Sequence, residues 1–382
     1  MTARGRALLL IAAGALYSGL SLGGRMFYLS AIFAVLALVF SLFCVVFTRR
    51  TLVLSCQLTP EQTPRGELAH LHIQARQRLA LPISPLEIVL CLGELRQTCA
   101  LSFRRRAARL TLDIPARHIG ELPAGIAEAY CTDALGLFRL RLPTDSALQT
   151  LLVLPRSFEV TPLRFLQGEE GRTLQNRTTE DLSSPEDTRS YRQGDALKRV
   201  HWKLSVRKRE LVVRKFETPA PPDTLILLDC TAPADGAAPE AAAALRDALC
   251  ETALSVAEMQ ARGSTPVRVP LYGVQAGEFL SDPTGGNTPQ LAEMLARQPF
   301  TGGEAFSRVL NMELRRMRRT GATVIITAHL DAGIAEGIKH IRRMGPSARL
   351  YYITAAPDAP QDRPYIAQLQ QNLVEVCYVT PA

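Results

Sequence analysis

The sequence lacks the short motifs that mark several common enzyme classes. It has no Gly-x-x-x-x-Gly-Lys-Ser/Thr loop for nucleotide phosphates, no Gly-x-Ser-x-Gly turn for a serine nucleophile and no His-Glu-x-x-His helix for zinc. No nucleophile stands at a readable spacing from a base. We therefore expect no catalytic residues and no cofactor. The alternative is a hydrolase acting at the membrane, which would use Asp229 or a histidine.

Paired cysteines are also missing. The eight cysteines are scattered along the chain, with no Cys-x-x-Cys pair and no spacing typical of zinc ligands. Cysteines of this kind are typical of small, buried apolar side chains in a reducing compartment. The pattern therefore favours a cytoplasmic location for the folded part of the chain.

Acidic residues are fewer than basic ones. The chain has 36 Asp and Glu against 44 Lys and Arg, a net charge of +8, and its arginines cluster at residues 104–106 and 315–316. A basic protein is attracted to the anionic inner leaflet of a membrane, so membrane lipid is an expected partner. No basic module with interleaved aromatic residues accompanies this charge, and we expect no nucleic acid partner.

Apolar residues are concentrated at the N-terminus. Two uncharged runs cover residues 7–22 and 26–47. The second, at about 22 residues, is long enough to cross a bilayer, whereas the first, at about 16, is marginal. Only a short turn separates them, so residues 1–50 are predicted to form a transmembrane helical hairpin.

Basic residues flank the hairpin unequally. Arg4 and Arg6 precede the first run and Arg49 and Arg50 follow the second, while only Arg25 lies between them. The positive-inside rule then places both ends in the cytoplasm, as in a multi-pass protein of the cell membrane with cytoplasmic soluble domains. A second interpretation is that residues 1–19 are a cleaved secretory signal. The soluble part would lie on the same side in either case.

The soluble part divides into two domains with different periodicities. Residues 51–166 contain short alternating or continuously apolar runs separated by Pro and Gly, which predicts an antiparallel β-sandwich domain of about seven strands. Residues 167–222 form a polar linker and a distinctive motif. Apolar strands then alternate with helical patterns over residues 223–382, which predicts an α/β domain with a mostly parallel sheet.

The most distinctive stretch covers residues 186–217, named here the signature segment. Asp195 suits a helix N-cap, and Leu197, Val200, His201 and Leu204 would follow as one apolar stripe. Trp202 and Val206 would lie on the opposite face. A helix that is apolar on two sides is either clamped between domains or offers one face to a partner. The candidate partner-binding residues are Arg189, Tyr191, Gly194, Asp195, Trp202, Lys203 and Arg207.

The signature segment also carries a family resemblance. Tyr191-x-x-Gly-Asp, followed by Lys198-x-Val-x-Trp-Lys-x-Ser-x-Arg207, resembles the signature of the bacterial domain-of-unknown-function 58 family, with small departures at Lys198, Val200 and Val206. The loop Asp133-Ala-Leu-Gly-Leu-Phe138 resembles a second motif of that family. The resemblance implies a C-terminal domain like von Willebrand factor A, and the company of MoxR-type AAA+ ATPases and membrane transglutaminase-like proteins. It implies no activity.

Domains like von Willebrand factor A often hold a divalent cation through Asp-x-Ser-x-Ser after the first strand, and Mg²⁺ needs several hard oxygen ligands. The matching residues here are Asp229, Thr231 and Pro233, and Asp331 is the candidate distal acid. Pro233 offers no side-chain oxygen. We therefore expect a degenerate remnant of a metal site, in which Asp229 accepts hydrogen bonds from its loop instead of binding a metal.

These observations predict a membrane-anchored, non-enzymatic interaction or scaffold protein. The resemblance suggests that it works with a MoxR-type AAA+ ATPase in the assembly or maturation of other proteins. The carboxyl ends of the parallel strands, near Asp229 and Asp331, are the expected rim for binding.

Overall fold

The computed structural model describes residues 1–78, 83, 85–93, 95–103, 106–144, 148–161, 187–191, 200–215, 223–231, 238–263, 265–272, 275–282, 286–300, 305–317, 320–357 and 359–381. For residues 187–189 and 214–215 it describes the backbone alone. The chain forms two compact units, Met1–Leu154 and Pro155–Ala382. The domain boundaries expected at residues 166 and 222 lie outside the described residues.

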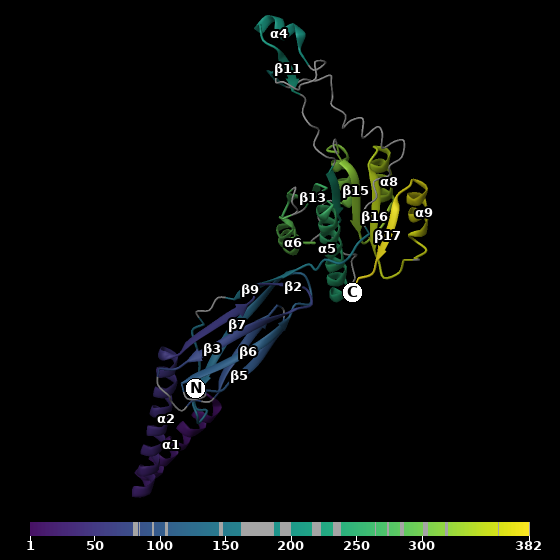
Figure 1. Cartoon of the computed structure of the whole chain (residues 1–382). Helices are drawn as coiled ribbons and strands as arrows, with labels where there is room; N and C mark the ends of the chain where they lie inside the picture. The colour runs from purple at the N-terminus through teal and green to yellow at the C-terminus, as the bar shows by residue number, and fades with distance from the viewer. Residues whose placement is uncertain are drawn as a thin grey trace. The chain divides into compact units, whose positions relative to one another are not determined.

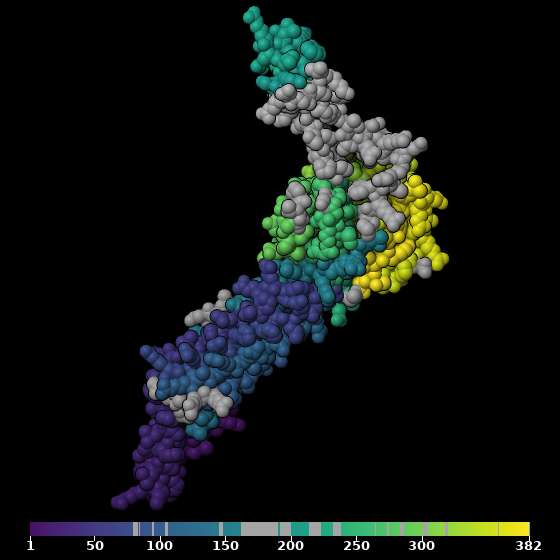
Figure 2. All heavy atoms as spheres, in the orientation of Figure 1, coloured from purple at the N-terminus to yellow at the C-terminus, as the bar shows by residue number. Residues whose placement is uncertain are grey.

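Two apolar helices open the first unit, as the sequence predicts. They are α1 (Ala3–Leu22) and α2 (Arg25–Thr51), and both are long and apolar enough to cross a membrane. Thr2 caps α1 by accepting a hydrogen bond from the backbone N–H of Gly5. Gly23, in the left-handed conformation at φ 66°, ends it. Figure 2 shows the hairpin side chains, in purple, extending from one end of the first unit.

The second helix continues directly into the first strand. Only Leu52 separates α2 from β1 (Val53–Thr59). Val45 is fully buried and belongs to the same hydrophobic core as the strands that follow, and Cys44 beside it is 1% exposed. The sequence assigned the whole run 26–47 to the membrane, but its last residues are packed inside the protein.

The strands after the hairpin, named here the β domain (residues 53–154), form two sheets. One has the order β1-β3-β6 and the other β2-β9-β7-β4-β5, with β8 beside β7. Figure 1 labels β3 and β6 of the first sheet and β2, β9, β7 and β5 of the second. The remaining strands are β2 (Gln62–Pro64), β3 (Leu68–Arg76), β4 (Leu86–Leu92), β5 (Leu95–Leu101), β6 (Ala107–Pro115), β7 (Gly120–Thr132), β8 (Arg139–Arg141) and β9 (Gln149–Leu154).

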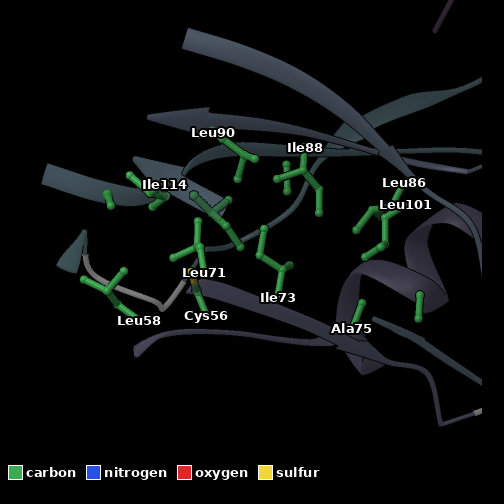
Figure 3. Close-up of a cluster of buried hydrophobic side chains, with 14 of the residues drawn as sticks. Cys56, Leu58, Leu71, Ile73, Ala75, Leu86, Ile88, Leu90, Leu101 and Ile114 are labelled. Atoms are coloured by element: carbon green, nitrogen blue, oxygen red, sulfur yellow. The ribbon is translucent and has the colours of Figure 1, made fainter. Parts of the chain in front are cut away.

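One core joins the two sheets. Alternate residues of β3, including Leu71 and Ile73, are fully buried, as are Ile88 and Leu90 of β4 in the other sheet. These side chains point toward one another from opposite strands (Figure 3). The strict alternation on β3 explains why its face toward the core is apolar while its other face carries His70 and His72.

The second unit contains a six-stranded sheet in the order β14-β13-β12-β15-β16-β17, named here with its helices the α/β domain (residues 223–381). Every described pairing is parallel except β13 with β14. The strands are β12 (Asp223–Leu228), β13 (Val267–Leu271), β14 (Gly277–Leu280), β15 (Thr320–Thr327), β16 (Ser347–Ile353) and β17 (Glu375–Val379). The helices are α5 (Pro239–Arg262), α6 (Thr288–Arg297), α7 (Phe306–Leu314), α8 (Ala332–Arg343) and α9 (Arg363–Gln371). All eight residues of β15 are buried, as expected of a sheet covered on both faces.

The signature segment forms a small antiparallel pair with one short helix. β10 (Asp187–Ser190) pairs with β11 (Val212–Lys215), and α4 (Trp202–Lys208) lies between them in sequence. The expected helix from Asp195 through Val200 and His201 is wrong in its start. Val200 forms a bridge to Val213 and His201 is the N-cap. The strand pairing of a buried β-branched residue outweighs the helical pattern read from the sequence.

Candidate functional site

The carboxyl ends of β12 and β15 bring Asp229 close to two polar residues, Thr327 and His329. Leu228 pairs with Ile326, so Asp229 follows beside Thr327, and its backbone N–H donates to Ile326 O at 2.9 Å. In chain order the strands lie third, second, first, fourth, fifth and sixth across the sheet. Asp229 and Thr327 therefore stand at the point where the strand order reverses, which is where open sheets of this kind bind ligands.

The Asp229 carboxylate is buried and held by protein donors. One oxygen accepts hydrogen bonds from the hydroxyl and the backbone N–H of Thr231, at 2.7 and 3.1 Å. The other accepts from the Thr327 hydroxyl at 2.6 Å and lies 3.3 Å from Nδ1 of His329. Asp229 itself is 2% exposed. Its hydrogen bonds thus tie the ends of two neighbouring strands together.

The predicted distal acid has a different task. Asp331 accepts a hydrogen bond from the backbone N–H of Ile334 at 2.6 Å and caps α8. Pro233 lies outside the described residues. Among the residues that the structure describes, no group of three or more His, Cys, Asp or Glu side chains could hold a metal ion. One carboxylate and two hydroxyls, already bonded to each other, fit poorly to the six oxygen ligands of Mg²⁺.

Cys230, next to Asp229, is a poor nucleophile. Burial first, and then the negative charge of Asp229, raise the pKa of its thiol to about 12. A thiol with this pKa carries almost no thiolate at neutral pH, and the thiolate is the reactive form. The Cys230 thiol is therefore poorly suited to covalent catalysis.

The signature segment presents an exposed apolar face on α4. Trp202 is 59% exposed and Val206 is 78% exposed, and Leu211, just before β11, is 42% exposed. The basic side chains Lys203 and Arg207 are exposed beside them. A lone tryptophan with an apolar neighbour and flanking cations has the composition of an interface hot spot.

Other residues of the same segment hold its backbone. Ser205 is buried, and its hydroxyl accepts from Val212 N at 2.9 Å and lies 3.0 Å from His201 O. Tyr191 donates its backbone N–H to Leu211 O at 2.7 Å, and Arg189 pairs with Val213 across the strands. Gly194 and Asp195 lie outside the described residues. The sequence did not single out Ser205, although a serine within a helix often bonds to the backbone carbonyl four residues earlier.

The loop at residues 133–138 also has a defined conformation. Asp133 is buried, and its carboxylate accepts from the backbone N–H groups of Leu135 and Phe138 at 3.1 and 2.7 Å. Thr2, at the start of the chain, bonds to the carbonyls of Gly136 and Leu137. The hairpin and the β domain are therefore joined at this loop as well as through α2.

Comparison with known proteins supports the family resemblance. Residues 187–346 match the model of the family described as protein of unknown function DUF58, which supports membership of that family. The matched residues include both α4 and the strand ends at Asp229 and Thr327. No curated protein matches the chain.

Three solved structures have some similarity to this chain. A CARDB domain from Pyrococcus furiosus, in complex with di-metal ions, is 12% identical over 27% of this chain and 92% of its own, with a TM-score of 0.18. Cwp6 from Clostridium difficile is 10% identical over 86% of this chain and 53% of its own, with a TM-score of 0.20. A cycloisomaltooligosaccharide glucanotransferase from Paenibacillus sp. is 11% identical over 85% of this chain and 52% of its own, with a TM-score of 0.16. These scores are too low to carry a structural argument.

Proposed function

We propose that this chain is a membrane-anchored, non-enzymatic interaction or scaffold protein that binds a protein partner through α4 of the signature segment. The hairpin spans the cell membrane, the β domain is a β-sandwich, and the α/β domain is like von Willebrand factor A. The partner is a MoxR-type AAA+ ATPase, and the complex serves the assembly or maturation of other proteins, in the company of a transglutaminase-like membrane protein.

The exposure of Trp202 is the observation that carries this proposal. Exposing a large aromatic side chain together with Val206 leaves apolar surface in water, which a folded chain ordinarily buries. Tryptophan and arginine are the residue types most enriched at interface hot spots, and Arg207 lies on the same short helix. A partner that covers this face would bury the tryptophan and pair with the cations.

The partner surface should be acidic around an apolar pocket. Lys203 and Arg207 belong to α4, Lys208 ends it, Arg209 follows, and all four are exposed. Complementary charge would speed the encounter, while the buried aromatic would supply most of the affinity. Binding is therefore expected to slow at high salt without being abolished.

Two features support a binding role over the hydrolase alternative. Both oxygens of Asp229 accept hydrogen bonds from the protein, so this carboxylate is a poor general base. The neighbouring thiol of Cys230 is protonated at neutral pH. The order of strands in the sheet, with its single antiparallel edge strand β14, supports the likeness to von Willebrand factor A.

Capture of a purified MoxR-type ATPase by the detergent-solubilised full chain tests the proposal. Trp202→Ala should weaken capture by at least roughly 2 kcal/mol, a loss of about thirtyfold in affinity, because the aromatic anchor is removed. Trp202→Phe should restore part of the binding. Leu95→Ala, which truncates an exposed apolar side chain of the β domain, serves as the matched control.

Equal capture by the wild type and Trp202→Ala would exclude α4 as the docking face. Absence of capture by the wild type at micromolar concentrations of either protein would exclude this ATPase as a direct partner.

A further inference from the structure

The loop Asp133–Phe138 of the β domain holds the first turn of the membrane hairpin. Thr2 donates its backbone N–H to Leu137 O at 2.9 Å, and its hydroxyl lies 2.6 Å from Gly136 O. Gly5 is buried one turn later, and a Cβ built on it would collide with the carbonyl oxygen of Leu137. A glycine at position 5 therefore lets α1 approach the loop this closely.

The loop itself is well braced. Asp133 accepts two backbone hydrogen bonds from within it, and Gly136 has a φ of 72°, which favours glycine. Leu135, at the tip of the turn, is 57% exposed. A fixed loop thus presents one apolar side chain to the outside, beside the start of α1.

The second helix, α2, enters the β domain near its C-terminal end, as α1 contacts the β domain near its N-terminal end. Residues of α2 up to Phe43 include many exposed apolar side chains, whereas Cys44, Val45 and Thr48 are buried. The part of the hairpin that projects from the β domain is therefore α1 after Gly5 and α2 before Cys44.

The projecting part of the hairpin is only just long enough to cross a bilayer, so no gap remains between the β domain and the membrane. At ~1.5 Å per residue, α1 after Gly5 is roughly 25 Å long and α2 before Cys44 is roughly 28 Å long. The hydrocarbon core of a bilayer is about 30 Å thick. The hairpin tip carries Arg25 and must reach the far headgroups, because a charge in hydrocarbon is costly. The near end of the hairpin then lies at the near edge of the hydrocarbon.

We propose that the Asp133–Phe138 loop rests in the phospholipid headgroup layer, held there by Thr2 and Gly5, with the Leu135 side chain at the boundary of the acyl chains. This inference rests on the proposed insertion of the hairpin and adds a second membrane contact, made by the soluble β domain. The β domain is thereby mounted against the membrane in a fixed orientation.

Charge at the same level agrees with this placement. Arg4 and Arg6 lie in the first turns of α1, Arg49 and Arg50 lie in the last turn of α2, and all four are exposed. They stand beside the loop or just beyond the buried part of α2. Guanidinium groups at this height can bind lipid phosphates, which favours the near approach of the β domain to an anionic leaflet.

Tryptophan fluorescence can measure this contact, because Trp202 is the only tryptophan in the chain. The full chain with Trp202→Phe and Leu135→Trp is reconstituted into liposomes of phosphatidylethanolamine and phosphatidylglycerol with brominated acyl chains. The introduced tryptophan should lose most of its emission relative to unbrominated liposomes. Equal emission in the two kinds of liposome would overturn the proposal.

The matched control is Trp202→Phe with Leu95→Trp. Leu95 is 74% exposed at the other end of the same sheet, since its partner Leu92 pairs with Ala124, whereas Glu87 pairs with Tyr130 near the loop. These two ends are roughly 20 Å apart at ~3.3 Å per residue. This variant should keep its emission, and quenching equal to that of Leu135→Trp would count against a specific contact.

Substitutions at two glycines of α1 distinguish the contact between Gly5 and the Asp133–Phe138 loop from membrane insertion of the hairpin. Adding Gly5→Leu to the Leu135→Trp protein should relieve quenching, because the new side chain forces Leu137 away. Gly14→Leu should not, since no atom lies within 4 Å of a Cβ at that position. Quenching that persists with Gly5→Leu would overturn the role of this contact.

Alkaline carbonate extraction distinguishes insertion of the hairpin from the membrane contact of the Asp133–Phe138 loop. Resistance to extraction without quenching of the Leu135→Trp protein would leave the anchor in place and remove the loop contact. Release of the protein by carbonate would remove both.

Discussion

The buried carboxylate of Asp229 acts as a brace between two strand ends. Its oxygens accept from Thr231 and Thr327 and leave little room for an added ion. A group that is fully hydrogen-bonded by its own protein gains little from exchanging those bonds for a weakly held cation. Among the described residues, Asp229 therefore has a structural role as a hydrogen-bond acceptor.

Calorimetry of the full chain in detergent should show no Mg²⁺ or Mn²⁺ binding at sub-millimolar affinity. Asp229→Ala should give the same flat titration as the wild type. Tight binding that disappears in Asp229→Ala would show that another oxygen completes the site, contrary to our interpretation.

Removing the same carboxylate should destabilise the α/β domain. Asp229→Ala leaves the N–H and the hydroxyl of Thr231 without their acceptor and removes one of the two acceptors of the Thr327 hydroxyl, at a cost of about 1–3 kcal/mol. Asp229→Asn keeps one acceptor oxygen and should cost less. Urea unfolding followed by circular dichroism would measure both, and an unchanged midpoint for Asp229→Ala would refute the bracing role.

The thiol of Cys230 should resist alkylation. With its pKa raised to about 12 from 9.0, the folded chain keeps it protonated at pH 8. The stabilisation from a neutral buried thiol is complete below pH 9 and is lost as the pH rises toward 12. Mass spectrometry after iodoacetamide treatment should find Cys230 unmodified unless the protein is unfolded first. Rapid labelling at pH 7 would instead support the hydrolase alternative.

At the scale of the element, α4 separates residues that build the segment from residues that face outward. Trp202 is 59% exposed, so Trp202→Ala should open little cavity and change the free energy of unfolding by no more than about 0.5 kcal/mol, as for other surface changes. Thermal melting of the full chain checks this. A drop corresponding to about 3–5 kcal/mol, the cost of truncating a buried tryptophan, would show that the residue is clamped between domains.

Ser205 should behave in the opposite way. Ser205→Ala deprives the N–H of Val212 of its acceptor and should cost about 1–3 kcal/mol within the signature segment. Limited proteolysis should then cut the chain between residues 200 and 215 faster than in the wild type. Val206→Ala, one residue away and 78% exposed, is the control and should leave the rate unchanged.

Elements with strong local signals were well predicted from the sequence. The helical patterns expected within residues 223–382 include α5, an Ala-rich helix that begins at Pro239 and ends at Arg262. β7 was missed because Pro123 and Gly125 interrupt its pattern, and β14 because four residues at a sheet edge carry no apolar period. The pairing of β7 with β4 joins strands that are distant in sequence, so no local rule could supply it.

In the candidate sites, too, features set by local sequence patterns could be predicted and features set by distant contacts could not. The meeting of Asp229 with Thr327 could be predicted because parallel strands end at one edge of the sheet. The ring of His329 beside them could not, since it depends on the path of a loop. The start of α4 was misplaced because the helix signal at Asp195 ignored the pairing of Val200 with Val213.

At the scale of the whole molecule, the arginines around the hairpin predict its orientation. A reporter fused after Ala382 should be active only in its cytoplasmic form, because Arg4, Arg6, Arg49 and Arg50 outnumber Arg25. A fusion truncated after Gly24 should place the reporter on the other side. Alkaline phosphatase activity from the full-length fusion would reverse the orientation and, with it, our interpretation of the cysteines.

The junction at Leu52 and the burial of Val45 also bear on how such a protein can be altered by recombination. A hairpin that made no contact with its soluble domain could be exchanged for another without harm to that domain. Here a foreign hairpin without an apolar residue at the position of Val45 would leave that part of the core unfilled. Even one residue added before Leu52 would turn the helix by about 100° and move its buried side away from the core. The hairpin and the β domain therefore have to be transplanted and engineered together.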